Sequence, residues 1–101
     1  MDIITNKAKE EFLKEYYKES FKNNWNLEEL EYIFNILPQT CQNALIIEWF
    51  DSIGIYINIS VTYGFNWYIN ELGGEDYNNR QEATKQAIIK ANEIYNLKFG
   101  E

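Results

Sequence analysis

The sequence contains no histidine, one cysteine and one proline among its 101 residues. The usual ligands of zinc, haem and most transition metals are therefore scarce, and we expect no metal and no cofactor. A single cysteine also excludes a disulfide within the chain. We interpret Cys41 as a small core residue, because no histidine base is present to activate it as a nucleophile.

Positive charge is scarce in the middle of the chain. Sixteen acidic and nine basic residues give a formal net charge of −7. Residues 38–78 contain acidic side chains but no Lys or Arg. A phosphate backbone requires neutralising cations, so we expect no direct nucleic-acid binding. The acidity is compatible with a basic protein partner, and equally with a role in solubility alone.

Long apolar runs are missing as well. No stretch approaches the length that crosses a membrane, and the first residues, MDIITNKAKEE, contain no apolar signal core. We therefore expect a cytoplasmic protein that does not enter membranes. The length predicts a single domain over residues 1–101. A hydrophobic content of 46% predicts that this domain folds despite its acidity.

The clearest pattern in the chain is an alternation of residue types between residues 53 and 71. One set is mostly aliphatic and aromatic, and the other consists of tyrosine and small polar residues. The first set is Ile55, Ile57, Ile59, Val61, Tyr63, Phe65, Trp67 and Ile69; the second is Tyr56, Asn58, Ser60, Thr62, Asn66, Tyr68 and Asn70. A period of two predicts an antiparallel β-hairpin around Gly64, with one apolar face and one polar face.

Helices are expected on both sides of this hairpin. Residues 6–22 and 27–36 carry apolar residues at helical spacing, and Asn26 with Glu29 predicts a capping box. Residues 80–95 form a third amphipathic pattern, for which Asn79 and Glu82 predict a second capping box. Its alanines allow close packing, so we dock this helix on the apolar face of the hairpin.

Residues 38–52 fit two interpretations. As a helix they place Cys41, Leu45, Trp49 and Ile53 in one row facing the core; as a strand, 44–50 would form a buried run. The helix is favoured. The predicted fold class is α+β: a helical part over 1–37, then over 38–101 a helix or strand, an antiparallel hairpin or three-stranded sheet, and a C-terminal helix packed on one sheet face.

Binding to another protein is the function that the polar hairpin face favours. Tyrosine provides contact area at low entropic cost, and Asn and Ser provide adaptable hydrogen bonds, although an ordinary solvated face has the same composition. The exposed hairpin edges also allow a homodimer. The candidate partner-binding residues are Tyr56, Asn58, Tyr68, Asn70, Glu71, Glu75 and Asp76.

Two alternatives depend on carboxylates. Glu71, Glu75 and Asp76 fit an acidic inhibitor that imitates nucleic acid and occupies the groove of a basic nucleic-acid enzyme. Glu48 and Asp51 lie three residues apart and fit a small carboxylate enzyme or a Mg²⁺ site. Because no histidine, activated cysteine or phosphate-binding loop supports catalysis, we predict a non-enzymatic protein and assign no catalytic, cofactor-binding or metal residue.

Three segments carry a family resemblance. They are LPQTCQNALIIEWFDSIGIYI (37–57), GFNWYIN (64–70) and RQEATKQAIIKANEIYN (80–96). Over residues 37–96 the chain resembles small uncharacterised proteins encoded by bacteriophages, prophages and mobile elements of low-GC bacteria. The resemblance implies a bacterial or phage-infected cytosol and an accessory role in host takeover or anti-defence.

Overall fold

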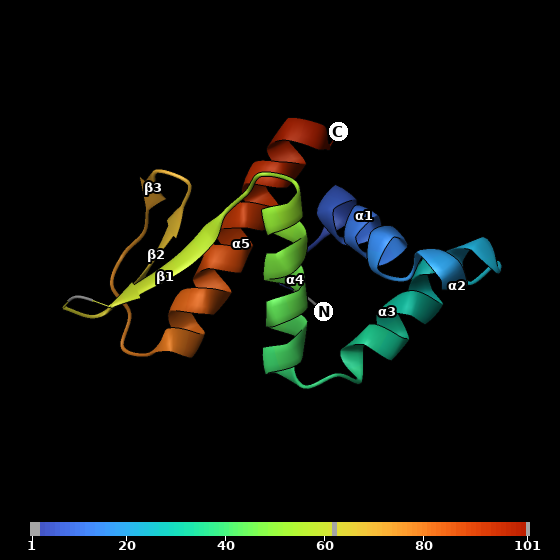
Figure 1. Ribbon diagram of the computed structural model, residues 1–101, viewed down its shortest axis with the longest axis horizontal. Helices are drawn as coiled ribbons and strands as arrows, with labels where there is room; N and C mark the ends of the chain where they lie inside the picture. Colours follow the sequence, from blue (N-terminus) through green and yellow to red (C-terminus); the bar gives the residue numbers. More distant parts are fainter. Residues whose placement is uncertain (1–2, 62, 101) are drawn as a thin grey trace.

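The computed structural model describes residues 3–61 and 63–100, and it has an α+β fold (Figure 1). The helical part contains α1 (Asn6–Tyr16), α2 (Lys18–Lys22), α3 (Leu27–Asn35) and α4 (Gln39–Ser52). The remainder contains β1 (Ile57–Val61), β2 (Phe65–Ile69), β3 (Leu72–Gly73) and α5 (Arg80–Phe99). The predicted fold class is thereby confirmed. Among the described residues, no helix combines the length and apolarity that a membrane crossing requires.

The three strands form one antiparallel sheet in the order β1-β2-β3. The register pairs Ile57 with Ile69 and Ile59 with Trp67, which places these apolar side chains on one face. α5 packs across that face, so Trp67 and Ile69 are buried and the two isoleucines are half-buried. The predicted docking of the C-terminal helix on the apolar face is therefore correct.

The outer end of the hairpin departs from the predicted pattern. Val61 lies on the apolar face but is 54% exposed, and Tyr63 is fully exposed. The hairpin tip extends past α5, so no helix covers these two side chains (Figure 1). Thr62, which the alternation assigned to the polar face, lies outside the described residues.

Residues 39–52 form a helix, which decides between the two interpretations of this segment. The orientation of this helix differs from the predicted one, because Cys41 is exposed and Gln42 is buried. Gln42 Nε2 donates to the carbonyl oxygens of Leu37, at 2.9 Å, and Asn35, at 3.4 Å. The Gln42 amide thus satisfies carbonyls at the end of α3. For this reason Gln42, and not Cys41, occupies the inner position.

The N-terminal helices also differ from the predictions in one respect. The expected single helix over residues 6–22 is interrupted at Tyr17, whose φ of −110° and ψ of 36° are not helical. The interruption separates α1 from α2 and leaves Tyr17 packed against the core, whereas Tyr16 is 44% exposed. Tyr17 follows the buried Leu13 by one helical turn, so the end of α1 already directs it toward the core, and the departure from the prediction is the break between α1 and α2.

Both predicted N-caps are present, but only one is a full capping box. Asn26 Oδ1 accepts from Glu29 N at 2.9 Å, and Glu29 Oε1 accepts from Asn26 N at 3.0 Å. At α5, Asn79 Oδ1 accepts from Glu82 N at 2.8 Å. The Glu82 carboxylate instead accepts from Gln86 Nε2 one turn later, at 3.1 Å, so the second box is only half formed.

The two ends of the chain are joined by side-chain amides of α5. Asn92 Oδ1 accepts from Thr5 N at 2.7 Å, and Asn96 Oδ1 accepts from Ala8 N at 2.9 Å. Asn96 Nδ2 also donates to the Thr5 carbonyl at 3.0 Å. Thr5 makes no side-chain cap for α1. The N-terminus of α1 is therefore capped by residues far along the chain, which fixes α1 against α5.

Candidate functional site

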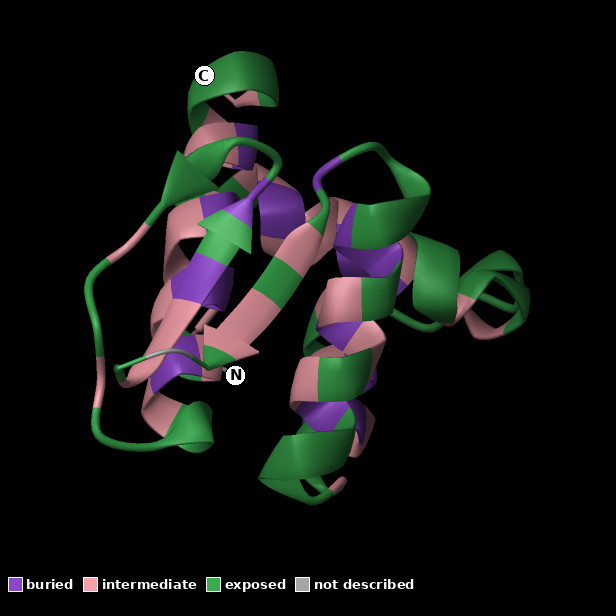
Figure 2. Cartoon of the chain, turned by 60° about the vertical axis from the view of Figure 1, so that its left-hand side comes forward, coloured by how far each residue is buried: buried purple, intermediate pink, exposed green. Residues whose placement is uncertain are grey.

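The polar side of the sheet is the candidate site that sequence reasoning selected. Asn58 pairs with Tyr68, and Ser60 pairs with Asn66, on the side opposite to α5. Figure 2 shows the alternation along β2, where buried residues flank an exposed one. We call this surface the outer sheet face. It consists of Tyr56, Asn58, Ser60, Asn66, Tyr68 and Asn70.

The two tyrosines of the outer sheet face are half-exposed. Tyr56 is 52% exposed and Tyr68 is 41% exposed. The Tyr68 ring lies over Gly73 of β3, where an added Cβ would stand 3.1 Å from Tyr68 Cε1. The ring therefore covers the backbone of a neighbouring strand and is held in place by it. A fixed, half-exposed tyrosine offers contact area with little entropy left to lose on binding.

Asn70 has a structural role within this surface. Its φ of 55° is the left-handed conformation that a two-residue hairpin turn requires at its first position. Its Oδ1 accepts from Tyr56 N at 3.1 Å, and its Nδ2 donates to the Gly54 carbonyl at 3.2 Å. The amide thus joins the entry to β1 with the β2–β3 turn, and both of its groups are occupied within the fold.

The predicted acidic residues lie at the margin of the outer sheet face. Glu71 is in the β2–β3 turn, and Glu75 and Asp76 follow β3; all three are exposed. An added Cβ on Gly64 would stand 3.3 Å from Asp76 Cβ, so the loop after β3 passes beside the β1–β2 turn. The acids therefore border the sheet on the side of β3.

The carboxylates considered for catalysis are not gathered into a site. Glu48 and Asp51 are both exposed on α4. Within residues 3–61 and 63–100, no group of three or more His, Cys, Asp or Glu side chains is arranged to hold a metal ion. The arrangement of these two residues is that of a solvated helix surface.

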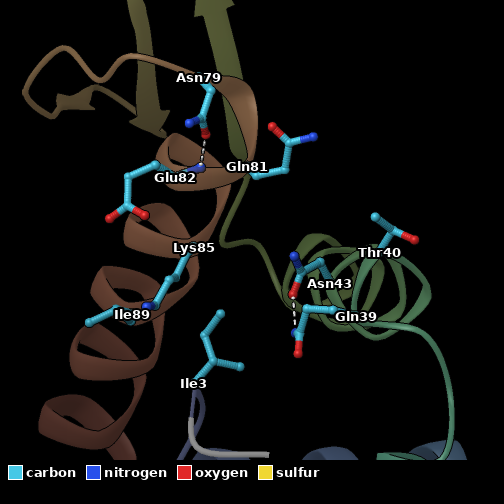
Figure 3. A pocket seen from close by; sticks show the side chains of 9 residues that line it. All are labelled: Ile3, Gln39, Thr40, Asn43, Asn79, Gln81, Glu82, Lys85 and Ile89. Atoms are coloured by element: carbon cyan, nitrogen blue, oxygen red, sulfur yellow. Dashed lines mark hydrogen bonds between the residues drawn. The ribbon is translucent and has the colours of Figure 1, made fainter.

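A groove between α4 and α5 was not predicted from the sequence. It has a volume of about 660 Å³ and lies between the first turns of both helices (Figure 3). Some of its polar groups are engaged within the fold: Gln39 Nε2 donates to Asn43 Oδ1 at 2.8 Å, and Asn79 Oδ1 accepts from Glu82 N at 2.8 Å. Lys85 and Glu82 place opposite charges along it, with Ile3 and Ile89 as apolar lining. The contributing segments lie about forty residues apart, so spacing along the chain carries no signal for this groove.

The ionisable groups with shifted pKa values lie on the helices. Burial raises the pKa of Tyr17 and of Tyr95. The hydrogen bond to Glu11 raises the pKa of Lys7, and the hydrogen bond from Lys14 lowers the pKa of Glu10. Lys7 and Glu10 are on α1, Tyr17 is at the α1–α2 junction, and Tyr95 is on α5. α1 packs on the side of α5 away from the outer sheet face.

The comparisons with known proteins do not extend this description. No family model matches the chain, and neither a curated protein nor a solved structure matches it.

Proposed function

We propose that this protein binds another protein through its outer sheet face and acts without enzymatic activity. The observation that carries the proposal is the pair of half-exposed tyrosines, Tyr56 and Tyr68, on a sheet face without charge. Residues 52–70 contain no Asp, Glu, Lys or Arg. The centres of protein interfaces are depleted in charge and enriched in tyrosine, which is the composition of this surface.

The biological setting of the proposal follows from the family resemblance of residues 37–96. It is an accessory role for a phage, prophage or mobile element in the cytoplasm of a low-GC bacterium, in host takeover or in countering a defence system. The partner in that setting is a protein of the host or of its defence. A basic partner is favoured, because the net charge is −7.

Affinity capture from the lysate of a low-GC bacterium tests the proposal. The wild-type protein should capture a partner in high salt, and the double variant Tyr56→Ala/Tyr68→Ala should lose it. A tyrosine at a binding hot spot contributes about 2 kcal/mol or more, so the loss of two at the centre of the interface should be nearly complete. Tyr32→Ala is the matched control, because Tyr32 is 70% exposed on α3. Equal capture by the wild type and the double variant would refute the proposal.

The same experiment distinguishes an acidic inhibitor that imitates nucleic acid from a protein that binds its partner through the outer sheet face. Nucleic-acid mimicry predicts a basic nucleic-acid enzyme that salt releases, because screening weakens exposed charge pairs. That partner would be lost on replacing Glu71, Glu75 and Asp76 by their amides, and retained by the double tyrosine variant. This pattern would support imitation of nucleic acid over binding through the outer sheet face.

A further inference from the structure

The outer edge of the sheet has unpaired backbone groups. β1 is an edge strand, and Asn70 N donates to the Tyr56 carbonyl at 3.0 Å across the ladder. In an antiparallel pair, residues that exchange hydrogen bonds alternate with residues that do not. The N–H and C=O groups of Ile57, Ile59 and Val61 therefore point away from β2. These three residues define the free edge of the sheet.

The opposite side of β2 supports this assignment. Gly74 N donates to the Trp67 carbonyl at 2.9 Å, and Phe65 exchanges hydrogen bonds with Tyr77. The odd-numbered residues of β2 thus bond toward β3, which leaves the even-numbered ones to bond to β1. The paired residues of β1 are then Asn58 and Ser60. The orientation of the free edge consequently rests on hydrogen bonds on both sides of the central strand.

The free edge lacks the features by which proteins usually block edge pairing. Those features are charged side chains, proline, bulges and a covering element. Residues 52–70 contain no charge and no proline, and β1 pairs with β2 in continuous register. Figures 1 and 2 show α4 beside the start of β1 and diverging from it toward the end of the strand. Val61 is apolar and 54% exposed, so an added strand would bury it.

We propose that an extended segment of a basic partner protein adds to the free edge as a fourth strand. The inference rests on the proposed function and specifies how the partner docks. On the side of α5 the segment presents apolar residues beside Ile59 and Val61, and on the other side small polar residues beside Asn58 and Ser60. Basic residues flank it, because exposed Asp51 lies at the end of α4 before β1 and exposed Asp76 lies beside Gly64 in the β1–β2 turn, while residues 38–78 contain no cations.

A second copy of the chain suits this edge less well. It would bring a further −7 of charge and a second α4 to the same place. Analytical ultracentrifugation of the protein alone should therefore show a monomer. A dimer that dissociates on Val61→Pro would overturn the proposal in favour of self-pairing.

A synthetic peptide tests the pairing directly. The probe is a capped octapeptide, Lys-Lys-Val-Thr-Val-Thr-Ile-Lys, and the control is the same peptide with proline replacing both threonines. At millimolar concentration the probe should slow amide exchange at Ile57, Ile59 and Val61 about tenfold, measured by NMR. Asn58 and Ser60, already paired with β2, should change little. Unchanged exchange at the three edge residues would overturn the proposal, and so would equal protection by the proline peptide.

Val61→Pro removes one edge donor while the ladder to β2 stays intact, because the Val61 N–H points outward. It should weaken peptide binding about tenfold. Val61→Ala keeps the N–H and loses only part of the apolar contact, so it should weaken binding by about threefold. Circular dichroism confirms that both variants fold. Equal binding by the two variants would contradict edge pairing.

These experiments separate the two proposals. A partner captured through Tyr56 and Tyr68 that leaves the edge amides unprotected would remove the edge inference and leave the proposed function standing. If the peptide protects the edge amides and the captured partner binds equally well without both tyrosines, the proposed function is refuted and the edge inference stands.

Discussion

Asn96→Ala is the substitution that most directly tests how the helical layer is held together. The side chain accepts from Ala8 N at 2.9 Å and donates to the Thr5 carbonyl at 3.0 Å. The first bond caps α1 at its third residue, and loss of such a cap costs about 1 kcal/mol. The second bond contributes about 1 kcal/mol more. Alanine is the better helix former by about 0.6 kcal/mol, which offsets part of the loss.

The expected net destabilisation is therefore about 1.4 kcal/mol, which corresponds to a fall in Tm of about 6–11 °C for a domain of this size. Urea denaturation followed by circular dichroism measures it. Asn43→Ala is the matched control, because Asn43 accepts only from Gln39 one turn earlier on α4. It gains the same helix propensity and should leave stability within about 0.5 kcal/mol of the wild type.

Equal stability of the two variants would refute the assignment of Asn96 as a remote cap. Asn96→Asp separates the two bonds. It keeps an acceptor for Ala8 N beside the positive end of α1, but it loses the donor to the Thr5 carbonyl. Its stability should fall between those of the wild type and Asn96→Ala.

Three further predictions concern the core. Gly74→Ala should cost about 1–3 kcal/mol in urea denaturation, because its Cβ would stand 2.0 Å from Cε2 of Trp67, which is 7% exposed; Gly73→Ala, facing a half-exposed tyrosine, should cost less. Gln42→Ala should lower the free energy of unfolding by about 1–2 kcal/mol. Gln39→Ala, at an exposed position, should leave it nearly unchanged, and equal losses in the two variants would contradict the assignment of Gln42 as a cap on α3. Burial raises the pKa of Tyr95, so its contribution to stability is full below a pH of about 10 and declines as the pH rises above that value. Between pH 10 and about 11 the stability of Tyr95→Phe should therefore decline less than that of the wild type, and an identical decline would contradict this.

The sheet and its covering helix could be predicted from the sequence because their signals are local. Alternation along the hairpin specifies which side chains share a face, and the register places Ile59 and Trp67 on one face as predicted. Asn26 with Glu29 carries the chemistry of a capping box within four residues, and the box is formed. Local chemistry of this kind does not depend on where the rest of the chain lies.

The features that were missed depend on partners far along the chain. The inward position of Gln42 is set by carbonyls at the end of the preceding helix, and no spacing within α4 indicates them. The amide of Asn92 binds Thr5, 87 residues away. Asn70 was assigned to the binding surface from its place in the alternation, yet the turn requires its amide. Side chains of Asn and Gln are predictable as polar, but their partners are not.

The distribution of charge explains how the chain can have an edge strand without charged residues. Edge strands without charge promote aggregation, and most proteins place a Lys or Glu on them. Within residues 3–61 and 63–100 the acids lie on the helices and on the loops bordering the sheet, so the net charge of −7 acts on the whole molecule while β1 and β2 remain neutral. Like-charged copies repel at a distance, whereas a segment with basic flanks is attracted to the same edge. Placing one lysine on the edge, as Val61→Lys, should leave the fold intact and abolish binding of the lysine-flanked peptide; undiminished binding would show that neutrality of the edge has no role in recognition.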